Sequence, residues 1–306
     1  MSHPFRHVVH QGPVLRAMGS LAVQALQQRV RGVQAGTCDL DKTLEVTLPP
    51  RDPAMVADYI RWAGGDPSAW RGQVPPHLFA QWALGLSHEL FCGLPYPLAK
   101  AVNAGCRIES HRPLPMGEPL HVRARLVEVD DDGRRAVLKQ EFITGTASAP
   151  DALVTRLDAL VPLGQPAKKG EKTAKRGGGG SRPTVPVAAR EIGTRRLAGD
   201  AGFRFACLTG DFNPLHWVPP YGKALGFGGT ILHGFGTLAI ALETMNKVLW
   251  AGDVSRLAEV EVRFTRPVRL PGRFGVYVHE NGLFVGDAPG GLANLTGTFT
   301  LRDSHV

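Results

Sequence analysis

Acid and base side chains lie close together in the stretch LTGDFNPLHWVPP, residues 208–220. Asp211 and His216 are five positions apart, and Asn213 and Pro214 between them favour a turn over a regular helix. A turn can bring both side chains to one water, so that one takes a proton from it while the other delivers a proton to a substrate. Histidine suits either role because its unperturbed pKa lies near neutrality. The alternative is a polar turn whose Asp and Asn only cap backbone groups.

A second candidate group follows at His233 and Gly234, where a long helix is predicted to begin. The first turn of a helix offers free N–H groups and the positive end of the helix dipole. Glycine also lets a ligand approach the backbone closely. The N–H of Gly234 is therefore a candidate donor to an oxygen that gains negative charge during a reaction. His233 either supports this site or only caps and orients the turn.

Helix and strand patterns that would position these groups follow in the same order in both halves of the chain. Apolar residues spaced by three and four predict a long helix in each half. These residues are Phe79, Trp82, Leu86 and Leu90 in the first half, and Phe235, Leu238, Leu242, Met245 and Leu249 in the second. Alternating apolar and polar residues predict strands. The strands fall within 119–129, 134–146, 152–163, 259–268, 273–280 and 293–302. Each half is thus predicted as a long helix wrapped by an antiparallel sheet, an α+β arrangement.

Two pairs of segments resemble each other across the halves, which indicates an internal duplication. Residues 108–117 align with 262–271 at a shift of 154, and residues 77–86 align with 233–242 at a shift of 156. At the second shift, the first half has no acid/base pair. The aligned positions are Met55 for Asp211, Ile60 for His216 and Leu78 for Gly234.

The bulk composition describes a soluble globular protein of about two domains. The chain has 306 residues, with 43% hydrophobic and 20% charged residues. The four cysteines form no C-x-x-C pair, so the sequence predicts neither a zinc site nor a redox dithiol. No secretory signal and no run of about 18 apolar residues is found, which favours a cytoplasmic protein without membrane insertion.

The net charge of +8 is concentrated in one segment. Residues 165–182 hold six Lys or Arg and one Glu, together with a run of four glycines. A basic, Gly-rich, apolar-poor segment cannot bury a core, so it is predicted as a flexible linker between domains at 1–164 and 183–306. The alternative is an unspecific anion contact. The remainder of the chain gives no reason to expect a nucleic-acid partner.

The segment LTGDFNPLHWVPPYGKALGFGGTILHGF strongly resembles the hydratase 2 motif of MaoC-like enoyl-CoA hydratases and dehydratases, which have the hotdog fold. FTRPVRLPG, residues 264–272, resembles the strand that follows in that family. The resemblance implies that Asp211 and His216 are the catalytic dyad and that Gly234 supplies the oxyanion-hole N–H. It also implies that Asn213 and His233 support the site. Two positions depart from the family pattern, where Val218 replaces an Asp and Gly222 replaces an Ala or Ser.

The resemblance implies a tandem hotdog with one active site, in the half at 183–306. The expected reaction is reversible hydration of a trans-2-enoyl-CoA to a (3R)-3-hydroxyacyl-CoA, with acyl-CoA as substrate and neither metal nor other cofactor. A homodimer of double-hotdog chains is left open. The dyad-free first half is expected to shape the acyl pocket through Phe79, Trp82 and Ala83, unless these residues are ordinary core. The rival functions are a hotdog thioesterase and a noncatalytic acyl-CoA-binding or assembly subunit.

Overall fold

The structure is a computed structural model, and its described part excludes the predicted linker except for Arg182. The linker prediction therefore lies outside the described residues. These are residues 4–12, 14, 16, 19, 23, 39–163 and 182–302.

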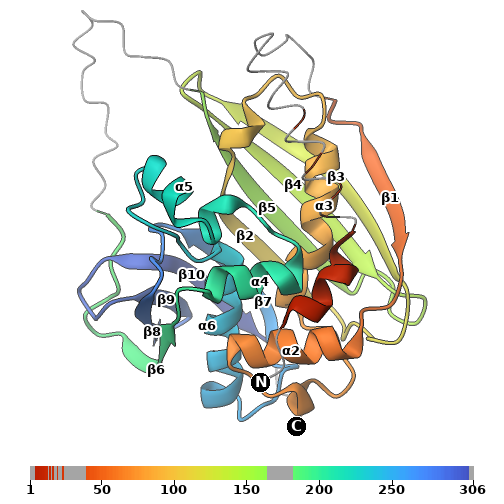
Figure 1. Ribbon diagram of the computed structural model, residues 1–306. Helices are drawn as coiled ribbons and strands as arrows, with labels where there is room; N and C mark the ends of the chain where they lie inside the picture. The colour runs from red at the N-terminus through yellow and green to blue at the C-terminus, as the bar shows by residue number, and fades with distance from the viewer. Residues whose placement is uncertain are drawn as a thin grey trace, which may run out of the picture.

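In the described part of the chain, ten strands form one antiparallel sheet in the order β1-β3-β4-β5-β2-β7-β10-β9-β8-β6 (Figure 1). The first half supplies β1 (Thr43–Leu48), β2 (Val102–Ser110), β3 (Leu120–Asp131), β4 (Arg135–Gly145) and β5 (Leu153–Pro162). The second half supplies β6 (Arg190–Leu197), β7 (Leu257–Phe264), β8 (Gly272–His279), β9 (Gly282–Gly286) and β10 (Ala293–Leu301). Read from each outer edge inward, the two halves have the same strand order, so the sheet consists of two equivalent units.

The two units join where β2 pairs with β7. Ile108 lies opposite Val260 and Cys106 opposite Val262, and all four side chains are buried. A Cβ on Gly105 would lie 2.5 Å from the carbonyl oxygen of Val262, so the close approach of the two backbones there requires glycine. This pairing makes one continuous sheet out of two five-stranded units.

Helices of both halves pack against the sheet (Figure 1). The α-helices are α2 (Pro53–Ala63), α3 (Ala80–Phe91), α4 (Ala201–Thr209), α5 (Pro219–Ala224) and α6 (Gly234–Leu249). Short 3-10 turns are η1 (Pro4–Gln11), η2 (Pro67–Trp70), η3 (Pro76–Leu78), η4 (Leu98–Lys100) and η5 (Pro214–His216). The described helices include none whose length and apolar character would let it cross a membrane.

The expected α+β arrangement of a long helix against an antiparallel sheet is confirmed in both halves. The chain order strand-helix-helix-four strands occurs in both halves, with α3 equivalent to α6 and α2 equivalent to α4, and the short α5 is an addition in the second half. Two details differ from the prediction. The first-half helix begins at Ala80 after the η3 turn, and α6 is buried around nearly its whole circumference rather than along one stripe. The reason is that α2 packs on the face of α6 that a single half would leave in solvent.

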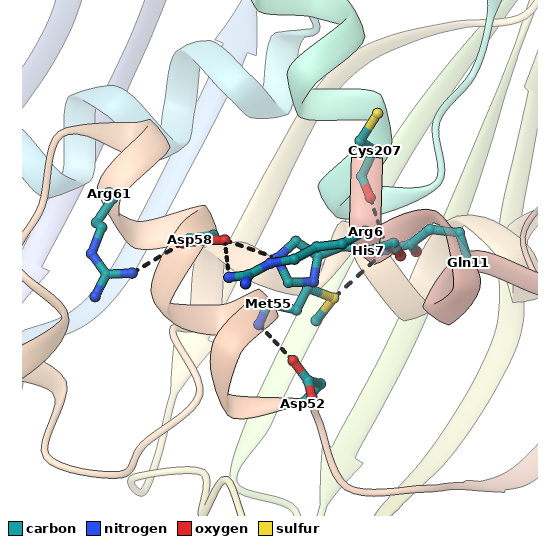
Figure 2. Close-up of polar contacts among 8 residues, drawn as sticks. All are labelled: Arg6, His7, Gln11, Asp52, Met55, Asp58, Arg61 and Cys207. Carbon is teal, nitrogen blue, oxygen red and sulfur yellow. Dashed lines mark hydrogen bonds and ion pairs between the residues drawn. The ribbon is translucent and has the colours of Figure 1, made fainter. Parts of the chain in front are cut away.

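The N-terminal turn η1 holds α2 and α4 together (Figure 2). Arg6 and His7 bind the Asp58 carboxylate on α2 at 2.7 and 2.9 Å. On the other side, the Gln11 amide donates to the carbonyl oxygen of Cys207 on α4 at 3.3 Å. Contacts from η1 therefore reach both helices, and α4 leads directly into the loop at 210–217.

Candidate active site

The loop after α4 has the turn that Asn213 and Pro214 predict. The helix ends on Gly210, whose left-handed backbone (φ 85°) favours glycine. The Asn213 side chain then accepts a hydrogen bond from the N–H of Leu215 at 3.1 Å and caps η5, while Pro214 occupies its first position. The Asp211 carboxylate accepts the N–H of Asn213 at 3.3 Å. These local hydrogen bonds fix the backbone positions of Asp211 and His216.

His216 is oriented by a backbone carbonyl. Its Nδ1 donates to the carbonyl oxygen of Ile231 at 2.9 Å. Because that oxygen can only accept, Nδ1 carries a proton, and Nε2 is the nitrogen left for proton transfer. A Cβ on Gly202 of α4 would lie 2.2 Å from the carbonyl oxygen of His216, so glycine at that position lets η5 pack against the helix.

His233 lies underneath His216, with the ring centroids 3.6 Å apart and the planes nearly parallel. Its Nε2 donates to the backbone carbonyl of Asp211 at 2.9 Å and lies 3.8 Å from the carboxylate. Burial, together with the neighbouring His216, lowers the pKa of His233 to about 3. The His233 ring is therefore neutral at pH 7, and its hydrogen bond to the Asp211 carbonyl helps to hold the loop at 210–217 in place.

The Asp211 carboxyl is largely buried, with 17% of the side chain exposed. Burial alone would raise its pKa, but His233, His216 and the N–H of Asn213 outweigh burial and hold the pKa below the ordinary value. Asp211 is therefore ionised at neutral pH. One side-chain oxygen or nitrogen from each of Asp211, His216 and His233 lies within 4.8 Å of the others. Groups at such a separation can bind one water between them.

These groups line a cavity of about 260 Å³ that also contains Gly234. Gly234 is the first residue of α6, so its N–H has no acceptor within the helix. A Cβ at this position would lie 3.0 Å from the ring of Phe264, a tight contact that favours glycine there. The predicted acid, base and N–H donor are thus brought to the wall of one cavity.

The first half also contributes to this cavity, through Ala101, Val102 and Asn103 at the start of β2. These residues were not predicted from the sequence. Nothing in their types indicates a site, since they reach the cavity only because β2 pairs with β7. Arg266 and Asn294 are further lining residues that were not predicted, although Arg266 lies within the quoted segment at 264–272.

The three residues expected to shape the acyl pocket lie outside the lining of this cavity. Phe79 and Ala83 are fully buried in the main hydrophobic core. Trp82 is also buried, and its indole N–H donates to Thr144 Oγ1 at 3.1 Å. Phe79 does pack edge-to-face on Phe235, with centroids 5.1 Å apart, and Phe235 lines the cavity. Their role as pocket residues stays a prediction.

The two departures from the family pattern have separate surroundings. Val218 precedes α5 and is not part of the described cavity lining. A Cβ on Gly222 would lie 2.0 Å from the carbonyl oxygen of Gly229, so the chain at 226–229 packs where a larger residue would sit. Glycine at position 222 therefore allows a close contact between two backbone segments beside the site.

Among the described residues, Asp211, His216 and His233 are one of two groups whose spacing could hold a metal ion. His216 Nδ1 and His233 Nε2 are each bonded to a backbone carbonyl, which leaves one nitrogen per ring for a ligand. The second group is His7, His10 and Asp52. The expectation of a metal-free reaction stays a prediction.

The alignment that placed Asp211 on Met55 and His216 on Ile60 is wrong. In the first half, α2 ends on the left-handed Gly64, the next residue is Gly65, and Asp66 caps η2 as Asn213 caps η5. By their places after the left-handed glycine and within the capped 3-10 turn, the counterparts are Gly65 for Asp211 and Ala69 for His216. A single shift fails because the segments between the helices differ in length. The first-half loop still has no acid/base pair.

Comparison with known proteins gives matches for this chain. Residues 184–289 match the family model described as MaoC like domain. 3-hydroxyacyl-thioester dehydratase X of Mycobacterium tuberculosis (strain ATCC 25618 / H37Rv) is 28% identical over 244 residues, covering 78% of this chain and 81% of that protein. Peroxisomal multifunctional enzyme type 2 of Mus musculus is 28% identical over 205 residues, covering 62% of this chain. The chain spans 27% of that mouse enzyme's length.

Solved structures share the fold. The crystal structure of HtdX from Mycobacterium tuberculosis has a TM-score of 0.67 at 23% identity and covers 85% of this chain and 100% of that one. A conserved hypothetical protein of the same species, described as a double hotdog fold, has a TM-score of 0.54 at 14% identity, covering 85% and 96%. Residues 184–289 therefore form a MaoC-like domain, which lies in the second half of a chain with the double-hotdog fold.

Proposed function

We propose that this protein is a hydro-lyase of acyl-CoA thioesters that interconverts trans-2-enoyl-CoA and (3R)-3-hydroxyacyl-CoA. The observation that carries the proposal is the cavity at which the ionised Asp211, the Nε2 of His216 and the N–H of Gly234 meet. The names of the relatives, which include a 3-hydroxyacyl-thioester dehydratase, support the same reaction class.

The proposal gives each group one role. The thioester oxygen accepts the N–H of Gly234, which stabilises the negative charge that develops there. Asp211 takes a proton from water as the water oxygen bonds to C3, and His216, which for this step carries a proton on Nε2 as well as on Nδ1, delivers the Nε2 proton to C2. A proton passing back from Asp211 to His216 restores the pair, and dehydration is the reverse sequence. The carbonyl of Ile231 keeps His216 in the orientation that this transfer needs.

No cofactor enters this reaction, because the thioester itself makes the C2 proton acidic. His233 and Asn213 are positioning residues in the proposal, since one holds the Asp211 carbonyl and the other caps η5. A cytoplasmic location and an assembly of two such chains belong to the same proposal.

A panel of enoyl-CoA substrates, with chiral analysis of the products, tests the proposal. We expect loss of enoyl absorbance with crotonyl-CoA or a longer enoyl-CoA, and a (3R) product. Release of free CoA thiol would instead identify a thioesterase, because hydration leaves the thioester intact. Measurable binding of every enoyl-CoA without any absorbance change would identify a noncatalytic acyl-CoA-binding subunit.

A further inference from the structure

A second cavity, of about 690 Å³, lies between α3, β1 and the N-terminal turn. This volume falls within the range of small-molecule sites. Apolar side chains make up much of its wall, among them Leu48, Met55, Trp82 and Leu86. Within the described part of the chain, its lining shares no residue with that of the catalytic cavity. The molecule therefore offers a separate apolar space for a ligand.

One wall of this second cavity carries a buried cation, Arg51, which is 9% exposed. Its guanidinium donates to Gln81 Oε1 and to the carbonyl oxygen of Pro49, both at 2.5 Å. Both acceptors are neutral. The Nε of Arg51 is buried and has no hydrogen-bond partner among the described residues. The guanidinium therefore keeps donors for a further acceptor.

Arg51 forms no ion pair with any carboxylate of the described residues, and burial without a countercharge lowers its pKa. Residues 13–38 contain neither Asp nor Glu. Asp52 and Glu89 also line the cavity, but Asp52 caps α2 by accepting the N–H of Met55, and Glu89 is exposed. Buried charges in proteins are normally paired, because an unpaired one loses hydration without compensation.

The position of Arg51 is set by a chain of side chains that reaches the catalytic half. Gln81 accepts from Arg51 and donates to Gln11 Oε1 at 3.2 Å. Gln11 donates in turn to the carbonyl of Cys207, and this last bond is drawn in Figure 2. The guanidinium is thus held before any ligand arrives, which reduces the entropy that binding would cost.

We propose that this cavity binds an aliphatic molecule with an anionic headgroup, whose headgroup pairs with Arg51 and whose chain lies against Met55, Trp82 and Leu86. A planar guanidinium fork recognises a carboxylate or a phosphate, and the apolar wall accepts an alkyl chain. This ligand is distinct from the acyl-CoA of the proposed reaction, and its binding does not depend on turnover.

Isothermal titration of the full chain, delipidated first, tests the proposal with dodecanoate, dodecyl phosphate and dodecanol. We expect at least one anion to bind about tenfold to a hundredfold more tightly than dodecanol, since a charge-assisted hydrogen bond contributes most of the difference. The two anions distinguish a carboxylate from a phosphate headgroup. Equal affinity for the alcohol and both anions, or no binding of any probe, would overturn the assignment.

Variants locate the ligand. Arg51→Gln should weaken anion binding to the level of dodecanol, Arg51→Lys should recover part of it, and the exposed Arg123→Gln serves as a matched control. Val46→Trp adds side-chain volume inside the cavity and should weaken the binding of all three probes while Arg51 is left in place. Undiminished anion binding by folded Arg51→Gln would contradict the proposal. So would competition between the bound anion and an enoyl-CoA, because the anion would then lie in the catalytic cavity.

Discussion

The loop at 64–70 in the first half and the loop at 210–217 in the second half share one backbone design. In each, a helix ends on a left-handed glycine, and a short side chain then caps a 3-10 turn that begins with proline. The second loop has one additional residue, Phe212, and Gly65 and Ala69 of the first loop occupy the positions of Asp211 and His216. The loop design is thus present twice, while the pair of acid and base side chains within the loop is present once.

The first-half position nevertheless holds a carboxylate and an imidazole, from other elements. A Cβ on Gly65 would lie 2.1 Å from the Glu243 carboxylate of α6. Glu243 accepts hydrogen bonds from His77 Nε2 at 3.1 Å and from the indole of Trp70 at 3.0 Å. His77 and Glu243 are each 2% exposed, whereas Asp211 borders a cavity. An acid beside a base becomes a catalytic candidate only where a substrate can reach it.

Separating the halves should have the largest effect. Residues 183–306 alone should be insoluble or inactive, because β7 would lose β2 and α6 would lose the cover of α2. The catalytic cavity would also lose Ala101–Asn103. Size-exclusion chromatography measures the solubility of the fragment and an activity assay measures its turnover, with the full chain as control. A soluble fragment with full activity would show that the first half is dispensable.

Replacing Asp211 or His216, the side chains that distinguish the two loops, should have the second-largest effect on activity. Asp211→Asn and His216→Ala should each lower kcat/KM by about 10²–10⁴-fold, since each removes one proton-transfer partner. The melting temperature should change little. The matched control is Asp66→Asn in the first-half loop, which should keep wild-type turnover. Near-wild-type rates in both dyad variants would refute the assignment.

The Phe79→Ala variant tests whether the first half shapes the acyl site. Phe79 is fully buried against Phe235, so the variant should lose about 3–5 kcal/mol of unfolding free energy. Because Phe235 lines the cavity at Asp211 and His216, the substrate preference of the variant should also shift toward longer acyl chains. Phe142→Ala, equally buried in β4, should lose stability without that shift. If both variants keep the wild-type preference, Phe79 is ordinary core.

Glu243→Gln should lower stability and leave turnover nearly unchanged, the opposite of what is expected for Asp211→Asn. Two hydrogen bonds to a buried carboxylate become bonds to a neutral amide, which should cost about 1.5–3 kcal/mol of stability. Turnover per folded molecule should stay within about twofold of wild type. Urea unfolding and initial rates measure the two quantities. A large rate loss at unchanged stability would make Glu243 part of the catalytic machinery.

Replacing the segment that connects the two halves should have the smallest effect. With residues 167–181 exchanged for a short neutral spacer, the melting temperature and kcat should be unchanged, because the segment has almost no apolar side chains to bury. A salt-sensitive rise in KM would show instead that its lysines bind the CoA phosphates.

Local chemistry explains what was predicted from the sequence. The turn at Asn213–Pro214 and the helix start at Gly234 depend on contacts between residues a few positions apart. The alternating strands and the repeated order of elements have the same local origin. For these reasons the turn at 210–217 and the α+β class could be predicted before the structure.

The tertiary structure decided what depends on residues far apart in the chain. Ala101–Asn103 reach the cavity through the β2–β7 pairing, and Glu243 reaches Gly65 through the packing of α6. Likewise, the types of Arg51 and its sequence neighbours do not show that it is buried without a countercharge. Side-chain type and spacing set which chemistry a residue can perform. Whether a substrate, a neighbouring carboxylate or solvent meets that residue is set by long-range packing.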